Sequence, residues 1–346
     1  MNLFELTYEE VAGELARRLG KDTRHHAARF YRDVFKRGKL SHPASPGSSG
    51  SPQADSHIDA AIILPGVTLI ERIEADGVTK FASRLDDGNV IESVIIPSNG
   101  RNTLCVSSQA GCRMGCTFCA TGQFGLARSL TAGEIVWQVH TARFALGHSI
   151  DNVVFMGMGE PLDNLDNVMR AINVISDQRG LDIQRSHITV STAGHADGIR
   201  RLASLEPGRL RLAVSLNAAD DALRSRLMPI NRMYPLTRLK QELLAFPLGT
   251  RDTILIEYVL IDGINNSRED AARLADYLAD LPVRINIIPC NPGVSEAFKA
   301  PSTDAITDFC KWLVEKKLFV RRRTPRGLSA QAACGQLGAR HSPARG

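Results

Sequence analysis

Residues 112–119 read Cys-Arg-Met-Gly-Cys-Thr-Phe-Cys, and this stretch indicates the chemistry around which the chain is organised. The thiols of Cys112, Cys116 and Cys119 are spaced C-x₃-C-x₂-C, with an aromatic residue directly before the last one. Cysteine thiolates are the usual protein ligands of iron–sulfur clusters. Three of them on one short loop can hold a [4Fe–4S] cluster and leave one iron without a protein ligand.

Two other uses of clustered cysteines fit the sequence less well. Structural zinc usually takes four Cys or His ligands, and no second C-x₂-C pair or H-x₃₋₅-H motif follows residue 119. A disulfide scaffold needs many cysteines in a short secreted chain, whereas this chain has 7 in 346 residues. An iron–sulfur cluster is therefore expected. Its open iron can bind the amino and carboxyl groups of S-adenosylmethionine (SAM), and in this respect the motif resembles that of the radical-SAM enzymes.

The bulk properties are those of a globular protein. With 43% hydrophobic and 23% charged residues, the chain is long enough for one large domain and a smaller one. It shows neither a signal-peptide pattern nor an apolar run of about 18 residues, and its unpaired thiols fit a reducing compartment. We expect a cytoplasmic protein without a membrane segment.

The formal net charge of +5 permits an anionic partner. A denser group of positive charges lies near the carboxyl terminus. It either contacts phosphates or forms a solvated helix end and edge strand. Its members are Lys316, Lys317, Arg321, Arg322, Arg323 and Arg326.

The first hundred residues divide into three parts. We expect a small helical domain over residues 1–40, in which Thr7 and Glu10 form a capping box and a second helix covers 23–35. Residues 41–57 read as a Pro/Gly/Ser linker, flexible in composition. A β-hairpin extension is expected over 58–98. Its strands cover 80–85 and 90–96 around an Asp-Asp-Gly-Asn turn.

Strand and helix patterns alternate from residue 99 to 338, with a short tail at 339–346. Such alternation is typical of a parallel sheet, so the fold class is α/β, a partial or full parallel β/α barrel. The expected strands are 102–106, 152–156, 188–191, 210–216, 254–260, 284–288 and 319–323. The expected helices are 132–146, 164–177, 197–205, 220–227, 236–246, 269–279 and 303–317. Thr131 with Glu134, and Ser267 with Asp270, mark two of the helix starts.

Glu92 is unusual in the predicted hairpin. A period of two places it on the same face as Val90, Val94 and Ile96. A carboxylate on an apolar face is costly unless it has a partner or a role, and there it is a competent proton acceptor. The alternative, which the pattern alone slightly favours, is that this face lies at an open sheet edge and Glu92 is solvated.

Polar motifs follow several of the predicted strands, and in a β/α barrel the carboxyl ends of the strands meet at one rim. Glu160, in Gly157-Met-Gly-Glu-Pro161, can accept from the amino group of SAM, and glycines there allow close approach. Serine and asparagine side chains at the next strand ends can pair with ribose, carboxylate and adenine. The alternative is a set of tight turns with no ligand. The expected SAM contacts are Gly159, Glu160, Ser191, Ser215, Leu216, Asn217 and Asn291.

Two further thiols, Cys105 and Cys334, lie outside the cluster spacing. Cys334 follows a basic stretch, and positive neighbours favour a thiolate. A thiolate near SAM is a natural methyl acceptor. The alternative, a buried and inert cysteine, suits Cys290 and Cys310, and local context alone leaves it open for Cys105 and Cys334.

Taken together, these motifs resemble the RlmN/Cfr family of radical-SAM RNA methyltransferases over nearly the whole chain. Beyond the cluster loop and the rim motifs, the resemblance lies in residues 30–38, 87–94, 104–109, 257–263 and 332–337. It implies that one SAM methylates Cys334 and that a second is cleaved at the cluster to a 5′-deoxyadenosyl radical, so that two SAM molecules are used per turnover. The radical takes a hydrogen from the methyl group on Cys334, and the resulting carbon radical adds to an adenine carbon.

The same resemblance implies roles for two more residues. Glu92 matches the proton acceptor, and Cys105 forms a transient disulfide with Cys334 that frees the methylated base. The implied partners are an RNA and a flavodoxin- or ferredoxin-type reductant, and we expect a monomer. The default target is carbon 2 of a 23S rRNA or tRNA adenosine. One alternative is methylation at carbon 8 of the adenosine. The others are a radical-SAM enzyme that acts on a peptide or small molecule, and a non-catalytic iron–sulfur or RNA-binding protein.

The sequence also departs from the family pattern at two places. The family usually has a histidine where Asn217 stands. It usually has acidic residues and an isoleucine in the stretch that is Leu328-Ser-Ala-Gln331 here. We expect the core chemistry to survive these differences, because the thiols and the cluster motif are retained.

Overall fold

The computed structural model describes residues 2–19, 24–40, 63–291 and 298–338. The predicted linker over 41–57 and the predicted tail over 339–346 lie outside the described residues. The division into domains remains a prediction.

A parallel sheet forms the centre of the molecule. Its strands follow one another in chain order, each paired in parallel with the next. The sheet does not close within the described part of the chain, so the α/β prediction is confirmed in its partial-barrel form. The strands are β4 (Arg101–Cys105), β7 (Asn152–Phe155), β8 (Ile188–Thr192), β9 (Arg211–Ser215), β10 (Ile254–Leu260), β11 (Val283–Pro289) and β12 (Val320–Arg322).

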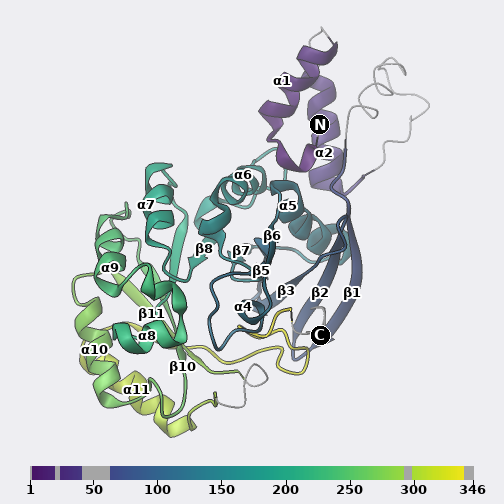
Figure 1. Cartoon of the computed structure of the whole chain (residues 1–346). Helices are drawn as coiled ribbons and strands as arrows, with labels where there is room; N and C mark the ends of the chain where they lie inside the picture. The colour runs from purple at the N-terminus through teal and green to yellow at the C-terminus, as the bar shows by residue number, and fades with distance from the viewer. Residues whose placement is uncertain (1, 20–23, 41–62, 292–297, 339–346) are drawn as a thin grey trace.

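Helices lie along the outer side of this curved sheet (Figure 1). In β10, alternate residues such as Ile256 and Tyr258 pack into the main core with helix residues such as Leu274 and Phe309, so Glu257 faces the inner side. The α-helices are α5 (Ala132–His140), α6 (Leu165–Ile175), α7 (Ala196–Ser204), α8 (Asp221–Leu227), α9 (Leu236–Ala245), α10 (Arg268–Leu278) and α11 (Thr303–Glu315). Shorter 3₁₀ turns are η3 (Pro161–Asn164), η4 (Arg185–His187) and η5 (Pro229–Arg232).

Both predicted capping boxes of the barrel are confirmed. Thr131 caps α5 with Glu134, and Ser267 caps α10 with Asp270, each through two reciprocal bonds. The helix expected over 132–146 is α-helical only to His140 and continues as a π-turn, η2 (Thr141–Ala145).

Three antiparallel strands extend the barrel sheet at its β4 edge. They are β1 (Val67–Ala75), β2 (Val78–Leu85) and β3 (Val90–Ser98), and β3 pairs with β4. The predicted hairpin is therefore confirmed, and β1 makes it a three-stranded meander. A separate ladder of β5 (Gln109–Cys112) and β6 (Gly125–Ser129), which the sequence did not indicate, flanks the cluster loop and α4 (Ala120–Gln123).

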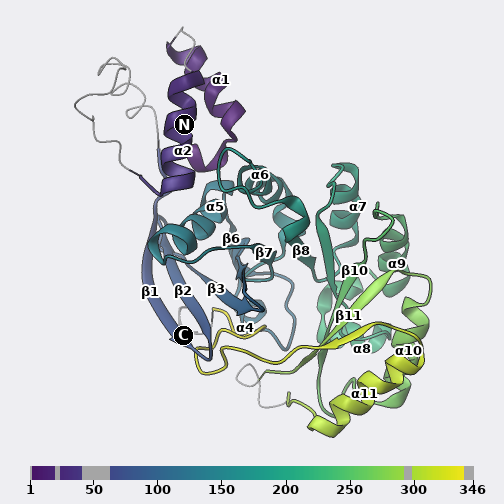
Figure 2. The ribbon, with the colours of Figure 1, turned by 180° about the vertical axis from the view of Figure 1, so that it is seen from behind.

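The amino-terminal helices pack against the outside of the barrel beside α5 and α6 (Figure 2). They are the 3₁₀ turn η1 (Leu3–Glu5), α1 (Tyr8–Leu19) and α2 (Arg24–Arg37). Glu10 accepts from the backbone N–H and hydroxyl of Thr7, as predicted. The rings of Phe4 and Trp137 lie 5.3 Å apart across the interface. None of the described helices is both long and apolar enough to cross a bilayer.

The carboxyl-terminal segment crosses from the α11 side of the molecule to the β1–β3 side (Figures 1 and 2). Ala330, Ala332 and Leu337 pack there with Cys105 and Val94 in a small apolar cluster. Ser329 donates from its backbone N–H and its hydroxyl to Asp76, at 2.9 and 2.8 Å. An acidic residue thus contacts the 328–331 stretch from the β1–β2 turn.

Candidate active site

The three cysteines of the motif lie on one turn between β5 and α4. Cys112 ends β5, Cys119 is the N-cap of α4, and the Cys119 N–H donates to the Cys116 carbonyl at 3.2 Å. Gly111 has φ of +83°, and a Cβ there would lie 2.1 Å from the Gly125 carbonyl oxygen. Only glycine therefore allows β5 to reach the loop at this angle.

The surroundings of these thiols suit a cluster. Burial raises the pKa of all three, of Cys112 to about 12, and the pKa of Cys116 is raised further by the nearby Cys119 and Cys112. Three mutually repelling buried thiolates require a cationic centre. Cysteine thiolates on one short loop are the usual protein ligands of an iron–sulfur cluster, so the residues of this loop fit such a cluster.

Glu160 connects the ends of β7 and β8. It is buried, and its two carboxylate oxygens accept from the backbone N–H groups of Leu162 at 3.1 Å and Ala193 at 2.7 Å. Burial raises the pKa of Glu160 to about 7, against these two hydrogen bonds. Gly159 before it has φ of +104°, and a Cβ there would lie 2.6 Å from the Cβ of Gln109. Glycine is therefore needed for the backbone to pack this closely against Gln109, and the contact of Gly159 with SAM remains a prediction.

Ser191, at the end of β8, is buried, and Ser215, at the end of β9, is half-buried. Asn217 differs from both, because its side chain is already bonded to protein. Its oxygen accepts from the Val259 N–H at 2.8 Å and its amide donates to the Met228 sulfur at 3.1 Å. Asn217 has φ of +58°, a conformation that asparagine tolerates better than most residues. Its contact with SAM remains a prediction.

Asn291 offers an acceptor at the rim. Its amide nitrogen donates to the carbonyl oxygen of Cys334 at 3.0 Å. Its side-chain oxygen is buried and has no hydrogen-bond partner among the residues that the structure describes. A buried acceptor without a partner is costly, and a ligand N–H, such as that of adenine, would satisfy it. This observation fits the predicted role of Asn291.

The segment around Cys334 is docked on the cluster loop. The Ala120 N–H donates to the Gly335 carbonyl at 2.7 Å, and the Thr121 hydroxyl donates to the Leu337 carbonyl at 2.7 Å. A Cβ at Gly335, where φ is +84°, would lie 3.1 Å from the Phe118 carbonyl oxygen. These contacts place Cys334 beside the cysteine motif although more than two hundred residues separate them in the sequence.

Cys334 is exposed, while Ala333 and Gln336 on either side are buried. Burial nevertheless raises the pKa of its thiol; the Glu257 carboxylate raises it further, and Arg323 opposes both. Arg323 is thus a basic neighbour that favours the thiolate, as expected, but burial outweighs its effect. Glu257, which the sequence analysis did not single out as a site residue, faces the same space and accepts from Asn286 at 2.7 Å.

Cys105 lies on β4 and is buried against the carboxyl-terminal segment. Burial raises its pKa, and Cys334 raises it further, so the two sulfurs are close enough to interact electrostatically. Cys290 is buried and Cys310 is half-buried, and burial raises the pKa of both. The structure thus brings Cys105 together with Cys334.

Glu92 is fully buried, so the solvated alternative that the pattern slightly favoured is wrong. The physical reason is that β3 lies between β2 and β4 and is covered by the carboxyl-terminal segment. One carboxylate oxygen of Glu92 pairs with the Lys80 ammonium at 2.9 Å, and the other accepts from the Gly338 N–H at 2.8 Å. Lys80, which is also buried, donates to the Gln331 carbonyl at 3.1 Å.

This ion pair holds the segment on both sides of Cys334. The sequence analysis did not identify Lys80, although the predicted hairpin contained a pattern that could have indicated it. In the hairpin register Lys80 lies opposite Val94, and Ala82 lies opposite Glu92. The two charges are therefore diagonal neighbours on one face of the predicted hairpin.

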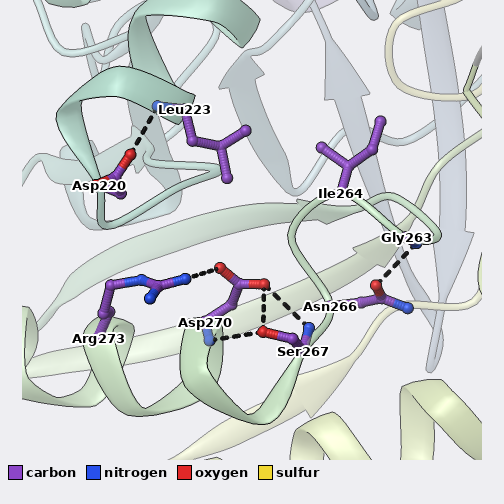
Figure 3. A pocket seen from close by; sticks show the side chains of 8 residues that line it. All are labelled: Asp220, Leu223, Gly263, Ile264, Asn266, Ser267, Asp270 and Arg273. Carbon is purple, nitrogen blue, oxygen red and sulfur yellow. Dashed lines mark hydrogen bonds and ion pairs between the residues drawn. The ribbon is translucent and has the colours of Figure 1, made fainter.

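The cavity shown in Figure 3, of about 490 Å³, lies at the β9–α8 and β10–α10 loops. None of the predicted site residues lines it. Its polar side chains bond to one another: Asp270 pairs with Arg273 and Ser267, and Asp220 accepts from the Leu223 N–H. The cavity is therefore not formed by the predicted site residues, although its Leu223 and Ile264 pack in the same apolar cluster as Cys116.

Comparison with known proteins agrees with this geometry. A model of the Radical SAM superfamily matches residues 106–275. The chain is 45% identical over 318 residues to the dual-specificity RNA methyltransferase RlmN of Geobacter sulfurreducens, covering 92% of this chain and 87% of that protein. It is 41% identical over 341 residues to the probable dual-specificity RNA methyltransferase RlmN 1 of Protochlamydia amoebophila, covering 98% and 94%. The crystal structure of a radical SAM methyltransferase from Sphaerobacter thermophilus matches with a TM-score of 0.89 at 36% identity, covering 98% of this chain and 99% of that one.

Proposed function

Because this chain belongs to the RlmN family of radical-SAM RNA methyltransferases, we propose that it methylates carbon 2 of an adenosine in 23S rRNA, tRNA or both by way of Cys334. It is a SAM-dependent RNA methyltransferase whose cofactors are a [4Fe–4S] cluster and SAM. When bound, the cluster supplies the electron that cleaves SAM to a hydrogen-abstracting radical. The docking of the Cys334 segment on the cluster loop, through Ala120 and Gly335 at 2.7 Å, carries the proposal.

The residues that would hold the cluster are Cys112, Cys116 and Cys119. For SAM, Glu160 would accept from the amino group, and the free oxygen of Asn291 would accept from the adenine. Gly159, Ser191, Ser215, Leu216 and Asn217 complete the proposed set at the strand ends. Their common position at the carboxyl ends of β7, β8, β9 and β11 supports this assignment.

Cys334 would carry the carbon. Its sulfur attacks the methyl group of SAM, the carbon–sulfur bond in SAM breaks, and the thiol proton leaves to solvent. After a hydrogen atom is removed from that methyl group, the carbon bonds to the adenine. The adduct would then give up its ring proton and its unpaired electron, the electron returning to the cluster when this is bound. The Cys105 thiolate then attacks the Cys334 sulfur, so that a disulfide forms as the sulfur–carbon bond breaks, and the released carbon takes up a proton, which leaves the base methylated. External thiols reduce the disulfide for the next turnover.

Glu92 would accept the proton that leaves the adenine carbon. Its support is its burial beneath the carboxyl-terminal segment, where Gly338 donates to one of its oxygens. Lys80, on its other oxygen, holds the carboxylate in place at 2.9 Å. The same residue would therefore position the segment and take the proton.

RNA would meet the basic residues at the carboxyl-terminal end of the barrel. All six are exposed, and among the described residues only the side chain of Arg326 forms a hydrogen bond within the protein, to the Pro97 carbonyl. Exposed cations of this kind contact phosphates and make binding salt-dependent. The proposal also includes a flavodoxin- or ferredoxin-type protein as the electron donor. It further includes a monomeric state and a cytoplasmic location.

Mass spectrometry of the protein as isolated tests it. We expect one methyl group on the peptide that contains Cys334, and none on that position in a Cys334→Ala variant. When the enzyme is loaded with the cluster, SAM and a reductant, it should transfer labelled methyl groups to RNA. Chromatography of the nucleosides, with 2-methyladenosine and 8-methyladenosine as standards, identifies which adenine carbon is methylated. Unchanged transfer by Cys334→Ala would rule out the carrier.

A further inference from the structure

Arg224, on α8, is a buried cation that the proposed mechanism does not use. It is 0% exposed, and it is the largest fully buried side chain among the described residues. Arginine is almost never fully buried unless it is paired with an opposite charge. Among the described residues, no Asp or Glu forms an ion pair with it. A buried charge that no carboxylate bonds directly is costly, so this site favours a further negative partner.

Its hydrogen bonds go to neutral acceptors at the rim. The guanidinium donates to the carbonyl oxygens of Leu216 at 3.0 Å, Ala193 at 2.7 Å and Ser215 at 3.3 Å, and to the side-chain oxygen of Asn231 at 2.8 Å. These four bonds occupy four of its five N–H groups. Asp221 acts on its charge from behind Asn231, whose amide donates to that carboxylate at 2.8 Å, but among the described residues no carboxylate bonds the guanidinium directly. The four bonds also fix the ends of β8 and β9, where the SAM contacts are expected.

The cluster loop lies next to this cation. The backbone N–H of Thr117 donates to the Leu227 carbonyl at 3.0 Å, and Leu227 lies one helical turn beyond Arg224 on α8. Cys116 and Phe118 pack into the same apolar cluster as Leu227. The guanidinium and the thiol of Cys116 are near enough to interact electrostatically.

We propose that Arg224 is a positioning residue that supplies the counter-charge for the three cluster thiolates while it fixes the strand ends that bind SAM. This inference rests on the proposed cluster site. Cysteine binds metal as the thiolate, so loading brings three negative charges to the loop beside Arg224. A fixed cation stabilises them, and it stabilises the added electron of the reduced cluster as well.

Two substitutions separate charge from hydrogen bonding. Arg224→Gln removes the charge but keeps an amide that can donate to carbonyl oxygens. Arg224→Lys keeps the charge but cannot bond three carbonyls in a fork. Arg226→Gln is the matched control, since Arg226 lies on the same helix and is exposed.

The measurement is the midpoint potential of the reconstituted cluster, followed by electron paramagnetic resonance without SAM or RNA. For Arg224→Gln we expect the equilibrium constant for one-electron reduction to fall at least tenfold, a shift of about 59 mV to more negative potential. For Arg224→Lys and Arg226→Gln the same equilibrium constant should stay within about twofold of the wild-type value, which is clearly smaller than a tenfold change.

A merely structural role predicts a different result. Both variants at Arg224 would then lower the unfolding temperature of the apoprotein, while the potential would stay unchanged in both or shift equally in both. Either outcome overturns the proposal. Should Arg224→Gln fail to fold, the lysine variant still decides, because a shifted potential with the charge retained contradicts the counter-charge role. A wild-type protein that binds no cluster contradicts the proposed function itself.

Discussion

Lys80→Met should strongly destabilise the protein, because it breaks an ion pair that has no access to water. The side chains of Lys80 and Glu92 are 1% and 0% exposed, and their charged atoms lie 2.9 Å apart. Methionine is close to lysine in length, so the substitution removes the charge with little change in volume. The carboxylate of Glu92 would then be left buried without this opposite charge.

Removal of one partner from a buried pair costs about 3–5 kcal/mol, because the other charge stays desolvated. Loss of the hydrogen bond from Lys80 to the Gln331 carbonyl at 3.1 Å acts in the same direction. The double variant Lys80→Met/Glu92→Leu should recover most of the loss, since apolar residues often replace a buried pair at no net cost. Lys36→Met is the control: its pair with Asp182 is exposed and should contribute about 0–1 kcal/mol.

Urea unfolding of the apoproteins, followed by circular dichroism, gives the free energies of unfolding. A shared m-value would show that the unfolded states are comparable. Hydrogen exchange of residues 327–338 gives a second readout, and their backbone amides should exchange faster in Lys80→Met than in the Lys36→Met control. A loss under about 1 kcal/mol for Lys80→Met, far below the range for buried pairs, would refute the reasoning.

Four further outcomes are expected. Cys334→Ala should abolish methyl transfer from labelled SAM to RNA. Cys105→Ala should keep the methyl group on Cys334 yet accumulate covalent protein–RNA product, visible as a slower band in denaturing gels that ribonuclease removes. SAM binding by the loaded enzyme should weaken as pH falls through about 7, where the Glu160 carboxylate takes up a proton, and equilibrium dialysis of Glu160→Gln should show no such dependence. Burial lowers the pKa of His140 from 6.5 to about 4. Below pH 6.5 the unfolded state therefore binds a proton that the folded state does not, and the free energy of unfolding falls by roughly 3 kcal/mol between pH 6.5 and pH 4. Urea unfolding of His140→Phe should not show this fall.

The barrel could be predicted because each strand and helix carries its own pattern. The strand expected over 254–260 coincides with β10, where a continuous apolar run is interrupted by one inward carboxylate, Glu257. The helices begin where capping residues such as Ser267 stand. The end of α5 was less predictable, because the apolar pattern continues through the π-turn of residues 141–145.

The arrangement of the site was only partly accessible. The cysteine spacing is local and could be interpreted directly, whereas the bond between Gly338 and Glu92 joins residues 246 positions apart. Nothing in the stretch Asp-Ala-Leu-Arg-Ser-Arg-Leu distinguishes the buried Arg224 from the exposed Arg226. The difference arises only when the ends of β8 and β9 meet around one of them. Local pattern thus indicates which chemistry is present, and tertiary packing determines which charges support it.

The way in which the carboxyl-terminal segment is held bears on how one thiol can serve successive partners. In the proposed cycle, Cys334 must meet SAM, then an adenine, then Cys105. The segment is anchored before it at Gln331 and after it at Gly338, both through the Lys80–Glu92 pair. Between these anchors the residue Cys334 is exposed, and the segment is held to the cluster loop through the Gly335 and Leu337 carbonyls. A change of partner by the sulfur therefore requires these few bonds to break, while the two anchors at the Lys80–Glu92 pair can keep the segment attached.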